Sequence, residues 1–380
     1  MAIGVIDRFG WLACRSMSAP RWYHCVSHRG REEVDQFFEY FKSCKPGTVG
    51  LVAAGGFDPR SCVIARLLSK AHQNAVAVII REERPSPASA LLDRAEHHVK
   101  ELTTHFPQHS IIKVEILDQN NAVVGGRKMI TALQSLHTQG KLGWKDVVID
   151  TSALSIGISF PLIRYFLELA RRGEGPTNVH VCMAGDAMLD EKIEPLASDR
   201  MSYVHSFDGG LSLHAASRAA KLWLPQLAKG PRRKAILDTV FRSLAPDDVL
   251  PILPFPSKNP RYADDLIADF TEELESTWEV GEGDVVYADA SDPLDMYRTL
   301  MRMHDYNGKV YAQTGGFAMI LSPIGSKALA LGTMMAAYER DLAVAYVESI
   351  GFDGSNLPPA SGSTDASELV HLWLAGEVYP

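Results

Sequence analysis

The sequence is poor in cysteine, and the cysteines that it has are not paired. They number five, namely Cys14, Cys25, Cys44, Cys62 and Cys182, with no Cys-x-x-Cys spacing among them. An odd set without that spacing indicates neither a disulfide framework nor a zinc site. We therefore expect a reducing, cytoplasmic location and no bound metal.

Long apolar runs are also missing. No stretch approaches the roughly 20 apolar residues that a membrane-spanning helix needs, so we expect no membrane span. Residues 1–15 mix apolar and charged side chains, without a positive segment leading into an apolar core. This pattern is not that of a signal peptide.

The chain lacks an excess of positive charge. It carries 38 lysines and arginines against 46 acidic residues, which gives a net charge of −8. A protein that coats duplex nucleic acid normally presents a basic stripe, so we do not expect such a partner. A small anionic ligand is compatible with this charge, because one pocket can be positive inside an acidic protein.

What the chain does have is enough apolar material for about two folded domains. Hydrophobic residues make up 46% of its 380 residues. Short apolar runs alternate with longer amphipathic segments. The predicted strands of the first half are Val49–Ala54, Val76–Ile80, Ile111–Leu117, Asp146–Asp150 and Val179–Met183. This alternation predicts an α/β fold with mostly parallel sheets.

The alternation of predicted strands and helices divides the chain into parts. We predict a first Rossmann-like lobe over residues 1–190 and a second over residues 249–350. Residues 191–248 are partly basic and punctuated by proline, so we interpret them as a helical connector between the lobes. Residues 351–380 begin as a Gly-, Ser- and Pro-rich stretch that we expect to be a loose tail. Glu368–Leu374, within it, is apolar enough to dock back onto the body.

Open parallel sheets bind ligands beyond the carboxyl ends of their strands, so the loops after the strands are the candidate sites. The first loop offers the candidate ligand contacts Gly55, Gly56, Asp58, Arg60 and Ser61. Paired glycines allow a ligand to approach the backbone closely. Asp58 is placed to cap the next helix, whereas Arg60 in its first turn opposes the helix dipole. Either a bound anion or Asp58 itself would offset that cost.

Two further loops follow the same logic. Thr151 and Ser152 follow the strand that ends at Asp150, and their hydroxyls can cap the next helix or bind a ligand. In the second lobe the candidates are Ser322, Ser326 and Lys327. Lys327 at a helix start is again unfavourable without a nearby anion.

One more candidate lies near the start of the chain. His28 ends a short strand that we predict over Tyr23–Ser27. That end of the strand is the edge where a ligand would sit, so His28 is included among the ligand contacts.

The first loop resembles motifs of two enzyme families. Ala54-Gly55-Gly56-Phe57-Asp58 is similar to the S-G-G-x-D-S phosphate loop of PP-loop ATP pyrophosphatases, with Ala54 in place of the leading Ser and Pro59-Arg60 in place of the final one. It also resembles the first glycine motif of methyltransferases that bind S-adenosylmethionine. That resemblance implies an acidic residue after the next strand to hold the ribose, where Glu82 and Glu83 stand.

The second loop and the two-lobe organisation carry another resemblance. A strand followed by Asp150, Thr151 and Ser152 and then a helix is similar to the second conserved element of CARF domains. The SAVED domain resembles two such units fused in one chain. The resemblance implies a sensor of cyclic oligonucleotides in prokaryotic defence.

The sequence shows no complete catalytic constellation, so it leaves the catalytic residues and the cofactor unassigned. Our leading hypothesis is a cytoplasmic sensor that binds a nucleotide-like anion and signals through a partner protein. The alternatives are a nucleotide- or S-adenosylmethionine-dependent transferase, including a degenerate PP-loop enzyme, and a scaffold subunit that binds no small molecule.

Overall fold

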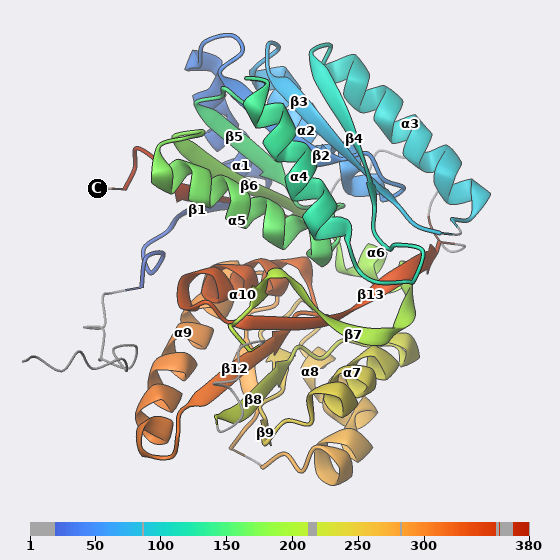
Figure 1. The fold of residues 1–380 in the computed structure, drawn as a ribbon, viewed down its shortest axis with the longest axis vertical. Coiled ribbons are helices and arrows are strands. Elements are labelled where there is room, and N and C mark those ends of the chain that lie inside the picture. Colours follow the sequence, from blue (N-terminus) through green and yellow to red (C-terminus); the bar gives the residue numbers. More distant parts are fainter. Residues whose placement is uncertain are drawn as a thin grey trace, which may run out of the picture.

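The computed structural model describes residues 20–85, 87–211, 219–281, 283–354, 357 and 368–379. They form two lobes, one above the other in the view of Figure 1. Residues 1–15, where we expect no signal peptide, lie outside the described residues. So does most of the stretch 351–367, which we predict to be loose.

The first lobe is built on a seven-stranded sheet of order β1-β14-β6-β5-β2-β3-β4. Its strands are β1 (Val26–Arg29), β2 (Val49–Ala54), β3 (Val76–Glu83), β4 (His109–Glu115), β5 (Asp146–Asp150), β6 (Asn178–Gly185) and β14 (Glu368–Ala375). Five neighbours, from β6 to β4, are parallel, and β14 runs antiparallel to both β6 and β1. Strand β2 is buried at every residue, as a strand covered on both faces should be.

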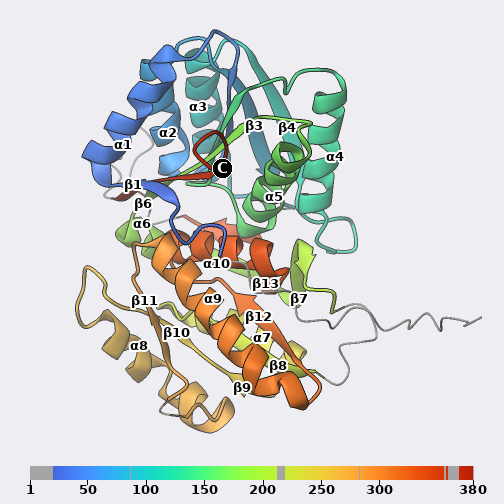
Figure 2. The ribbon, with the colours of Figure 1, turned by 90° about the vertical axis from the view of Figure 1, so that its left-hand side faces the viewer.

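Helices cover both faces of this sheet (Figure 2). One face carries α1 (Gly30–Phe38), α2 (Val63–Ala71) and α3 (Ser89–His105), and the other carries α4 (Gly125–Thr138) and α5 (Ile156–Arg172). Apolar side chains alternate between these two helical layers along each strand. Leu51 packs toward the first layer, for example, whereas its neighbour Val52 packs toward the second.

The second lobe contains a five-stranded sheet of order β7-β13-β12-β8-β9 and a two-stranded sheet, β10-β11. Its strands are β7 (Glu194–Asp208), β8 (Ala220–Pro225), β9 (Asp248–Val249), β10 (Ile252–Pro254), β11 (Val286–Ala288), β12 (Phe317–Ser322) and β13 (Ala343–Asp353). Its helices are α7 (Pro231–Leu244), α8 (Tyr262–Asp269), α9 (Pro293–Val310) and α10 (Lys327–Arg340), and α6 (Ala187–Lys192) leads into it. Among the described strands of this lobe, only the β7–β13 pairing is antiparallel. The predicted α/β fold with mostly parallel sheets is thus confirmed.

Two predicted segments differ in detail from the structure. Residues 191–248 contain α7 but also β7 and β8, so this segment builds the second sheet and is not only a helical connector. Strand β7 is half-exposed at a sheet edge and therefore lacks the apolar run of a buried strand. The predicted loose tail contains β14, which lies between β1 and β6 and is buried along most of its length.

A short segment, residues 20–25, joins the lobes from outside the sheets. We call it the strap. Its Trp22 is fully buried, donates from its indole to the carbonyl of Leu374 at 2.8 Å, and donates from its backbone N–H to the Tyr297 hydroxyl at 3.2 Å. Leu374 belongs to the first sheet and Tyr297 to α9. The strap therefore ties the second lobe to strand β14.

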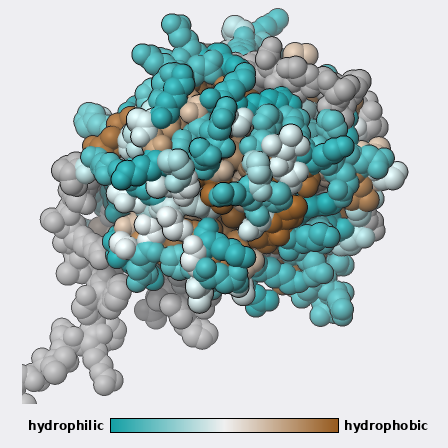
Figure 3. Space-filling model, turned by 90° about the horizontal axis from the view of Figure 1, so that it is seen from above, coloured by the Kyte–Doolittle hydropathy of each residue, from teal (hydrophilic) through white to brown (hydrophobic). Residues whose placement is uncertain are grey.

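The surface of the first lobe is mainly polar. From above, the first lobe presents mostly hydrophilic side chains with small apolar areas between them (Figure 3). Within the described part of the chain, no helix has both the length and the apolarity to span a membrane.

Candidate functional site

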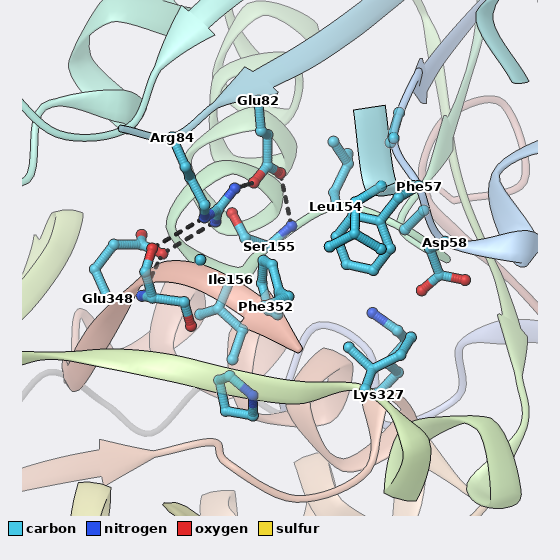
Figure 4. A pocket seen from close by; sticks show the side chains of 18 of the residues that line it. Phe57, Asp58, Glu82, Arg84, Leu154, Ser155, Ile156, Lys327, Glu348 and Phe352 are labelled. Carbon is cyan, nitrogen blue, oxygen red and sulfur yellow. Dashed lines mark hydrogen bonds and ion pairs between the residues drawn. The ribbon is translucent and has the colours of Figure 1, made fainter. Parts of the chain in front are cut away.

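A cavity of about 520 Å³ lies between the two lobes. Its walls come from the loops that follow β2, β3 and β5 in the first lobe and from β13 and the loop after β12 in the second (Figure 4). The carboxyl ends of parallel strands from both lobes thus open onto one space. The three loops predicted to meet, Gly55–Ser61, Asp150–Ser155 and Ser322–Lys327, each contribute residues to it.

Lys327 provides a positive charge in this cavity. It is the first residue of α10, whose N-cap Ser326 accepts a hydrogen bond from the Leu329 backbone at 3.2 Å. Its ammonium group points toward Asp58 (Figure 4) and makes no hydrogen bond or ion pair with any residue that the structure describes. Burial lowers the pKa of Lys327 and the nearby charge of Arg60 lowers it further, while the carboxylates of Asp190, Asp58 and Glu82 offset this in part. An unpaired ammonium at a helix N-terminus favours an anionic ligand.

Arg60 lines the cavity, and of the two alternatives considered for its charge, a bound anion or Asp58, the structure shows Asp58. Its guanidinium is only 1% exposed and donates to both Asp58 oxygens, at 2.9 and 2.7 Å, and to Asp190 at 2.7 Å. The Asp58 carboxylate also caps the turn Pro59–Cys62 by accepting from the Arg60 backbone at 2.9 Å. Burial alone would raise the pKa of Asp58, but Arg60 holds it below its usual value. Carboxylates, not a ligand, therefore neutralise Arg60.

The two glycines of the first loop serve different needs. A side chain on Gly55 would lie 2.6 Å from Val99 and 2.8 Å from Ile79, so the packing of α3 on β3 requires glycine there. A side chain on Gly56 would meet nothing within 4 Å. Gly56 lines the cavity, so its backbone is open to a ligand.

An ion bridge that the sequence analysis missed crosses the cavity floor. Arg84, just after β3, donates to Glu82 at 2.9 Å, to Glu348 of β13 at 3.2 Å and to the carbonyl of Ser349 at 2.9 Å. Burial raises the pKa of Glu348 despite the opposing charge of Arg84. The signal for this bridge was present, since charged residues follow the apolar runs of both strands at the ligand-binding edge.

The side chain of Glu82 in β3 also contacts the start of α5. Its Oε1 accepts a hydrogen bond from the Ser155 backbone at 2.8 Å, while its Oε2 faces Arg84. Ser155 is the N-cap residue of α5 and lines the cavity, and its hydroxyl has no hydrogen-bond partner among the described residues. This hydroxyl is buried at the cavity wall and is a second polar group, besides Lys327, without a partner among the described residues.

The rest of the cavity wall is largely apolar. Phe57 from the first lobe and Phe352 from the second lie with ring centroids 5.2 Å apart. Leu154 and Ile156 stand beside them (Figure 4). Such a wall suits a flat aromatic group, because rings stack on aromatic faces and bury their apolar surface.

Several predicted ligand contacts lie outside the cavity wall. In the second loop, Ser152 is fully buried, donates to Asp150 and accepts from the Ala184 backbone at 2.8 Å. Thr151 donates to the carbonyl of Cys182 at 3.1 Å, so the hydroxyls expected to cap α5 join strands instead. Burial raises the pKa of Asp150 to about 7.

The remaining predicted contacts are equally engaged elsewhere. Ser61 is buried and donates to the Gly56 carbonyl at 3.4 Å. Ser322 accepts from the Trp223 indole at 2.9 Å and donates to the carbonyl of Ala345 at 2.8 Å, which makes it part of the core of the second lobe. His28 lies in β1 and contacts His371 rather than the cavity. The hydroxyl groups of Ser61 and Ser322 thus make hydrogen bonds within the folded protein and do not line the cavity.

The cavity therefore joins an unpaired cation, an unpartnered hydroxyl, open backbone and apolar walls. Among the described residues, no cluster of His, Cys, Asp or Glu side chains is arranged to hold a metal ion. The arrangement is suited to binding.

Comparison with known proteins gives little guidance. No protein-family model matches the sequence, and no curated protein resembles it significantly. One similar solved structure, described as a universal stress protein of Pseudomonas aeruginosa, shares 10% identity over 80% of this chain and 94% of its own, with a TM-score of 0.22. A hydrogen sulfide-producing enzyme of Fusobacterium nucleatum shares 11% identity over 77% and 82%, with a TM-score of 0.20. At these scores the α/β description depends on the topology given above alone.

Proposed function

We propose that the protein binds an anionic, nucleotide-like ligand in the cavity between its lobes. The observation that carries the proposal is the ammonium group of Lys327, which faces the cavity from a helix N-terminus without a hydrogen-bond or ion-pair partner in the described structure. The carboxylates of Asp58, Asp190 and Glu82 lie near enough to raise the pKa of Lys327, but none of them pairs with it directly. A buried ammonium without a direct partner is unfavourable, and a phosphate would supply a hydrogen-bonded counter-charge.

The other features of the cavity support a nucleotide over a simple anion. Its volume of about 520 Å³ lies in the range of roughly 300–1,000 Å³ that is typical of small-molecule sites. Phe57 and Phe352 offer aromatic faces to a base, while Ser155 offers a hydroxyl. The ligand would thus place its phosphate toward Lys327 and its base between the lobes.

The transferase alternatives find less support. The resemblance to methyltransferases requires an acidic side chain free to hold a ribose. Both oxygens of Glu82 already accept hydrogen bonds, while Glu83 lines the cavity with the Lys113 ammonium 3.9 Å from its carboxylate, so only Glu83 is left for that role. The resemblance to PP-loop enzymes involves Asp58, whose two oxygens hold Arg60. A binding role, without catalysis, uses the cavity as it stands.

We therefore propose a ligand sensor of the CARF or SAVED kind, which signals through a partner protein. The two facing lobes and the second loop support this interpretation by resemblance. In such a sensor the ligand contacts both lobes, and a change in their packing reaches the partner. The scaffold alternative, in which the cavity stays empty, is an outcome of the following test.

The test is a thermal-shift screen of the protein with ATP, S-adenosylmethionine, cyclic dinucleotides and cyclic oligoadenylates, and with adenosine as a control without phosphate. A ligand present at 100 times its dissociation constant stabilises the native state by about 2.7 kcal/mol. We expect at least one phosphate-bearing compound to raise the melting temperature, and adenosine to do so less.

Two variants make the test specific. Lys327→Gln should abolish most of the shift, whereas Lys309→Gln, which alters an exposed lysine at the end of α9, should leave it unchanged. No shift with any compound would contradict the proposal and favour the scaffold. A shift that is insensitive to Lys327→Gln would place the ligand elsewhere.

A further inference from the structure

Away from the cavity, four side chains from four adjacent strands form one continuous hydrogen-bonded chain. Nδ1 of His28 in β1 lies 3.0 Å from Nδ1 of His371 in β14, and Nε2 of His371 lies 3.1 Å from Nδ1 of His180 in β6. Nε2 of His180 lies 3.3 Å from the Asp146 carboxylate in β5. His371, His180 and Asp146 are fully buried, while His28 is partly exposed at the sheet edge. The Phe37 ring of α1 stacks on His371 with centroids 3.6 Å apart.

The chemistry of the chain fixes the direction of its hydrogen bonds. The Asp146 Oδ1 also accepts from Tyr40 at 2.9 Å and from Asn178 at 2.8 Å. Burial would raise the pKa of Asp146, but these hydrogen bonds and that of His180 hold it below its usual value, so the carboxylate is ionised and can only accept. His180 must then carry its proton on Nε2 and present a bare Nδ1. It follows that His371 carries its proton on Nε2 and His28 carries its proton on Nδ1, because each ring is neutral and each contact needs one donor.

This chain takes up one extra proton without losing a hydrogen bond. The proton binds Nε2 of His28, whose Nδ1 proton passes to Nδ1 of His371. The Nε2 proton of His371 then passes to Nδ1 of His180. Every contact keeps one donor and one acceptor, and the positive charge ends on His180 beside the Asp146 carboxylate.

A second extra proton has no such place. The three rings then carry five protons on their six nitrogens. One proton lies on the outer nitrogen of His28 and one on the His180 nitrogen that faces Asp146, which leaves three protons for the two ring-to-ring contacts. One of the two ring-to-ring contacts must hold two N–H groups that face each other. Two adjacent imidazolium rings also repel in a buried site. The hydrogen-bonded side chains therefore keep all their contacts with one extra proton and lose a ring-to-ring contact with two.

The contact between His28 and His371 helps to hold β1 on the first sheet, and β1 is connected to the second lobe through the strap and Arg29. The two residues are direct partners in the register of β1 with β14, and β14 is the only described strand with which β1 pairs. Strand β1 continues from the strap, and its last residue, Arg29, pairs with Asp292 at the start of α9 at 2.9 Å. Loosening β1 would free both sets of contacts to the second lobe.

We propose that the chain from His28 to Asp146 is an acid-sensitive latch, which holds β1 and the strap at neutral pH and releases them when two protons enter. This inference is independent of the proposed ligand. Release of the strap would loosen the lobes that enclose the cavity, so acid would act on the site from a distance.

The surroundings agree with a neutral chain at pH 7. The ionisable groups that face it from the packed elements are Glu33 beside His28 and Tyr40, Cys44, Lys145 and Glu377 around Asp146. Burial lowers the pKa of His28, and Glu33 offsets this only in part. Burial lowers the pKa of His180, and burial with two histidine neighbours places the pKa of His371 well below its usual value.

The sign of the pH effect follows from these shifts. The unfolded or released histidines bind protons with a pKa of about 6.5, whereas the pKa values of the latched histidines are lowered and the latched chain has no place for a second proton. The latched state is thus favoured above about pH 6.5 and weakens as the pH falls below it.

The test is amide hydrogen exchange of the full chain at pH 7.5 and pH 5.5, corrected for the intrinsic pH dependence of exchange. We expect the protection of residues 20–29 to fall by about tenfold or more in acid, while that of β2 is retained. His28→Asn keeps a donor toward His371 but cannot titrate there, so it should remove most of this acid response. His97→Gln, a change of an exposed histidine on α3, should behave as the unaltered protein.

Equal protection of residues 20–29 at both pH values would overturn the latch, as would an undiminished acid response in His28→Asn. Should that variant lose β1 even at pH 7.5, nitrogen NMR of the histidine rings in the unaltered protein decides. The latch requires the proton on Nδ1 of His28 and on Nε2 of His371 and His180 at pH 7.5. The opposite proton position on any of the three rings would contradict it.

Discussion

The guanidinium of Arg84 in the first lobe donates a hydrogen bond to the carboxylate of Glu348 in the second at 3.2 Å. Both side chains are almost fully buried at the cavity, and the pKa of Glu348 is raised because burial outweighs the charge of Arg84. The bridge thus links the lobes at the wall of the cavity, yet it is costly when Glu348 is ionised.

Because of this cost, we expect Glu348→Gln to stabilise the native protein by an amount that depends on pH. Because the folded-state pKa of Glu348 is above the unfolded value, the native protein loses stability as the pH rises through that folded-state pKa. Glutamine avoids this loss, and a pKa difference of one between the two states corresponds to about 1.4 kcal/mol. We expect the variant to be more stable than the unaltered protein at pH 7.5 and equal to it near pH 4 in denaturant unfolding. Glu174→Gln, on the surface, is the control; a loss of stability at pH 7.5 would show that the bridge stabilises the fold.

The pair Asp58 and Arg60 predicts the opposite behaviour. Arg60→Met leaves Asp58 buried without its counter-charge, so we expect a loss of about 3–5 kcal/mol in urea unfolding. Asp186→Ala removes only a helix cap, at the start of α6, and should cost about 1 kcal/mol. If Arg60→Met costs no more than the cap variant, Arg60 is not a structural ion-pair residue and its assignment to the ligand returns.

The two neighbouring glycines offer a matched pair. Gly55→Ala forces a methyl group against Val99 and Ile79 and should cost about 1–3 kcal/mol of stability. Gly56→Ala points a methyl group into open space and should change stability by less than about 0.5 kcal/mol. It should nonetheless weaken binding of whichever compound scores in the thermal screen. Equal stabilities of the two variants would contradict the packing described here.

Lys327 should cost the empty protein stability. Its pKa is lowered by burial, so the unfolded chain binds the proton more tightly than the folded chain does. Without ligand, Lys327→Gln is expected to be at least as stable as the unaltered protein at pH 7.5, with an advantage that shrinks toward about pH 10.5. Thermal unfolding across this range checks the trend. A clear loss of stability at pH 7.5 would mean that the ammonium has a partner within the protein.

The sequence was most informative where local pattern and tertiary role coincide. Runs such as Val49–Ala54 are buried on both faces, so their apolar character alone predicts a parallel strand. Strand β7 was missed because an edge strand buries few of its residues, and its polar sequence resembles a linker. Strand β14 was recognised only as an apolar segment, since nothing local shows that it inserts between β1 and β6.

The site followed the same division. The meeting of the two first-lobe loops could be predicted, because parallel strands of one sheet carry their carboxyl ends to one edge. The loop Ser322–Lys327 follows a strand of the second sheet, so its place beside them depends on how the lobes pack. The hydrogen-bond and ion-pair partners of each side chain could not be predicted from the sequence. Arg60 and Lys327 both stand at helix starts, yet Arg60 pairs with its neighbour Asp58 and with Asp190, which is distant in sequence, whereas no described residue pairs with Lys327. Ion pairs between distant segments decide which cation is left for a ligand.

If Lys327 holds an anionic ligand between the lobes, the affinity for that ligand must depend on the charge of Lys327. Calorimetric titration measures this with the best compound from the thermal screen and three proteins, namely the unaltered protein, Lys327→Gln and Lys309→Gln, each at low and high salt. We expect Lys327→Gln to weaken binding by about tenfold or more and to reduce its salt dependence, because one charge-assisted contact is lost. Lys309→Gln should bind as the unaltered protein does. Equal affinity and equal salt dependence for all three proteins would show that Lys327 does not hold the ligand.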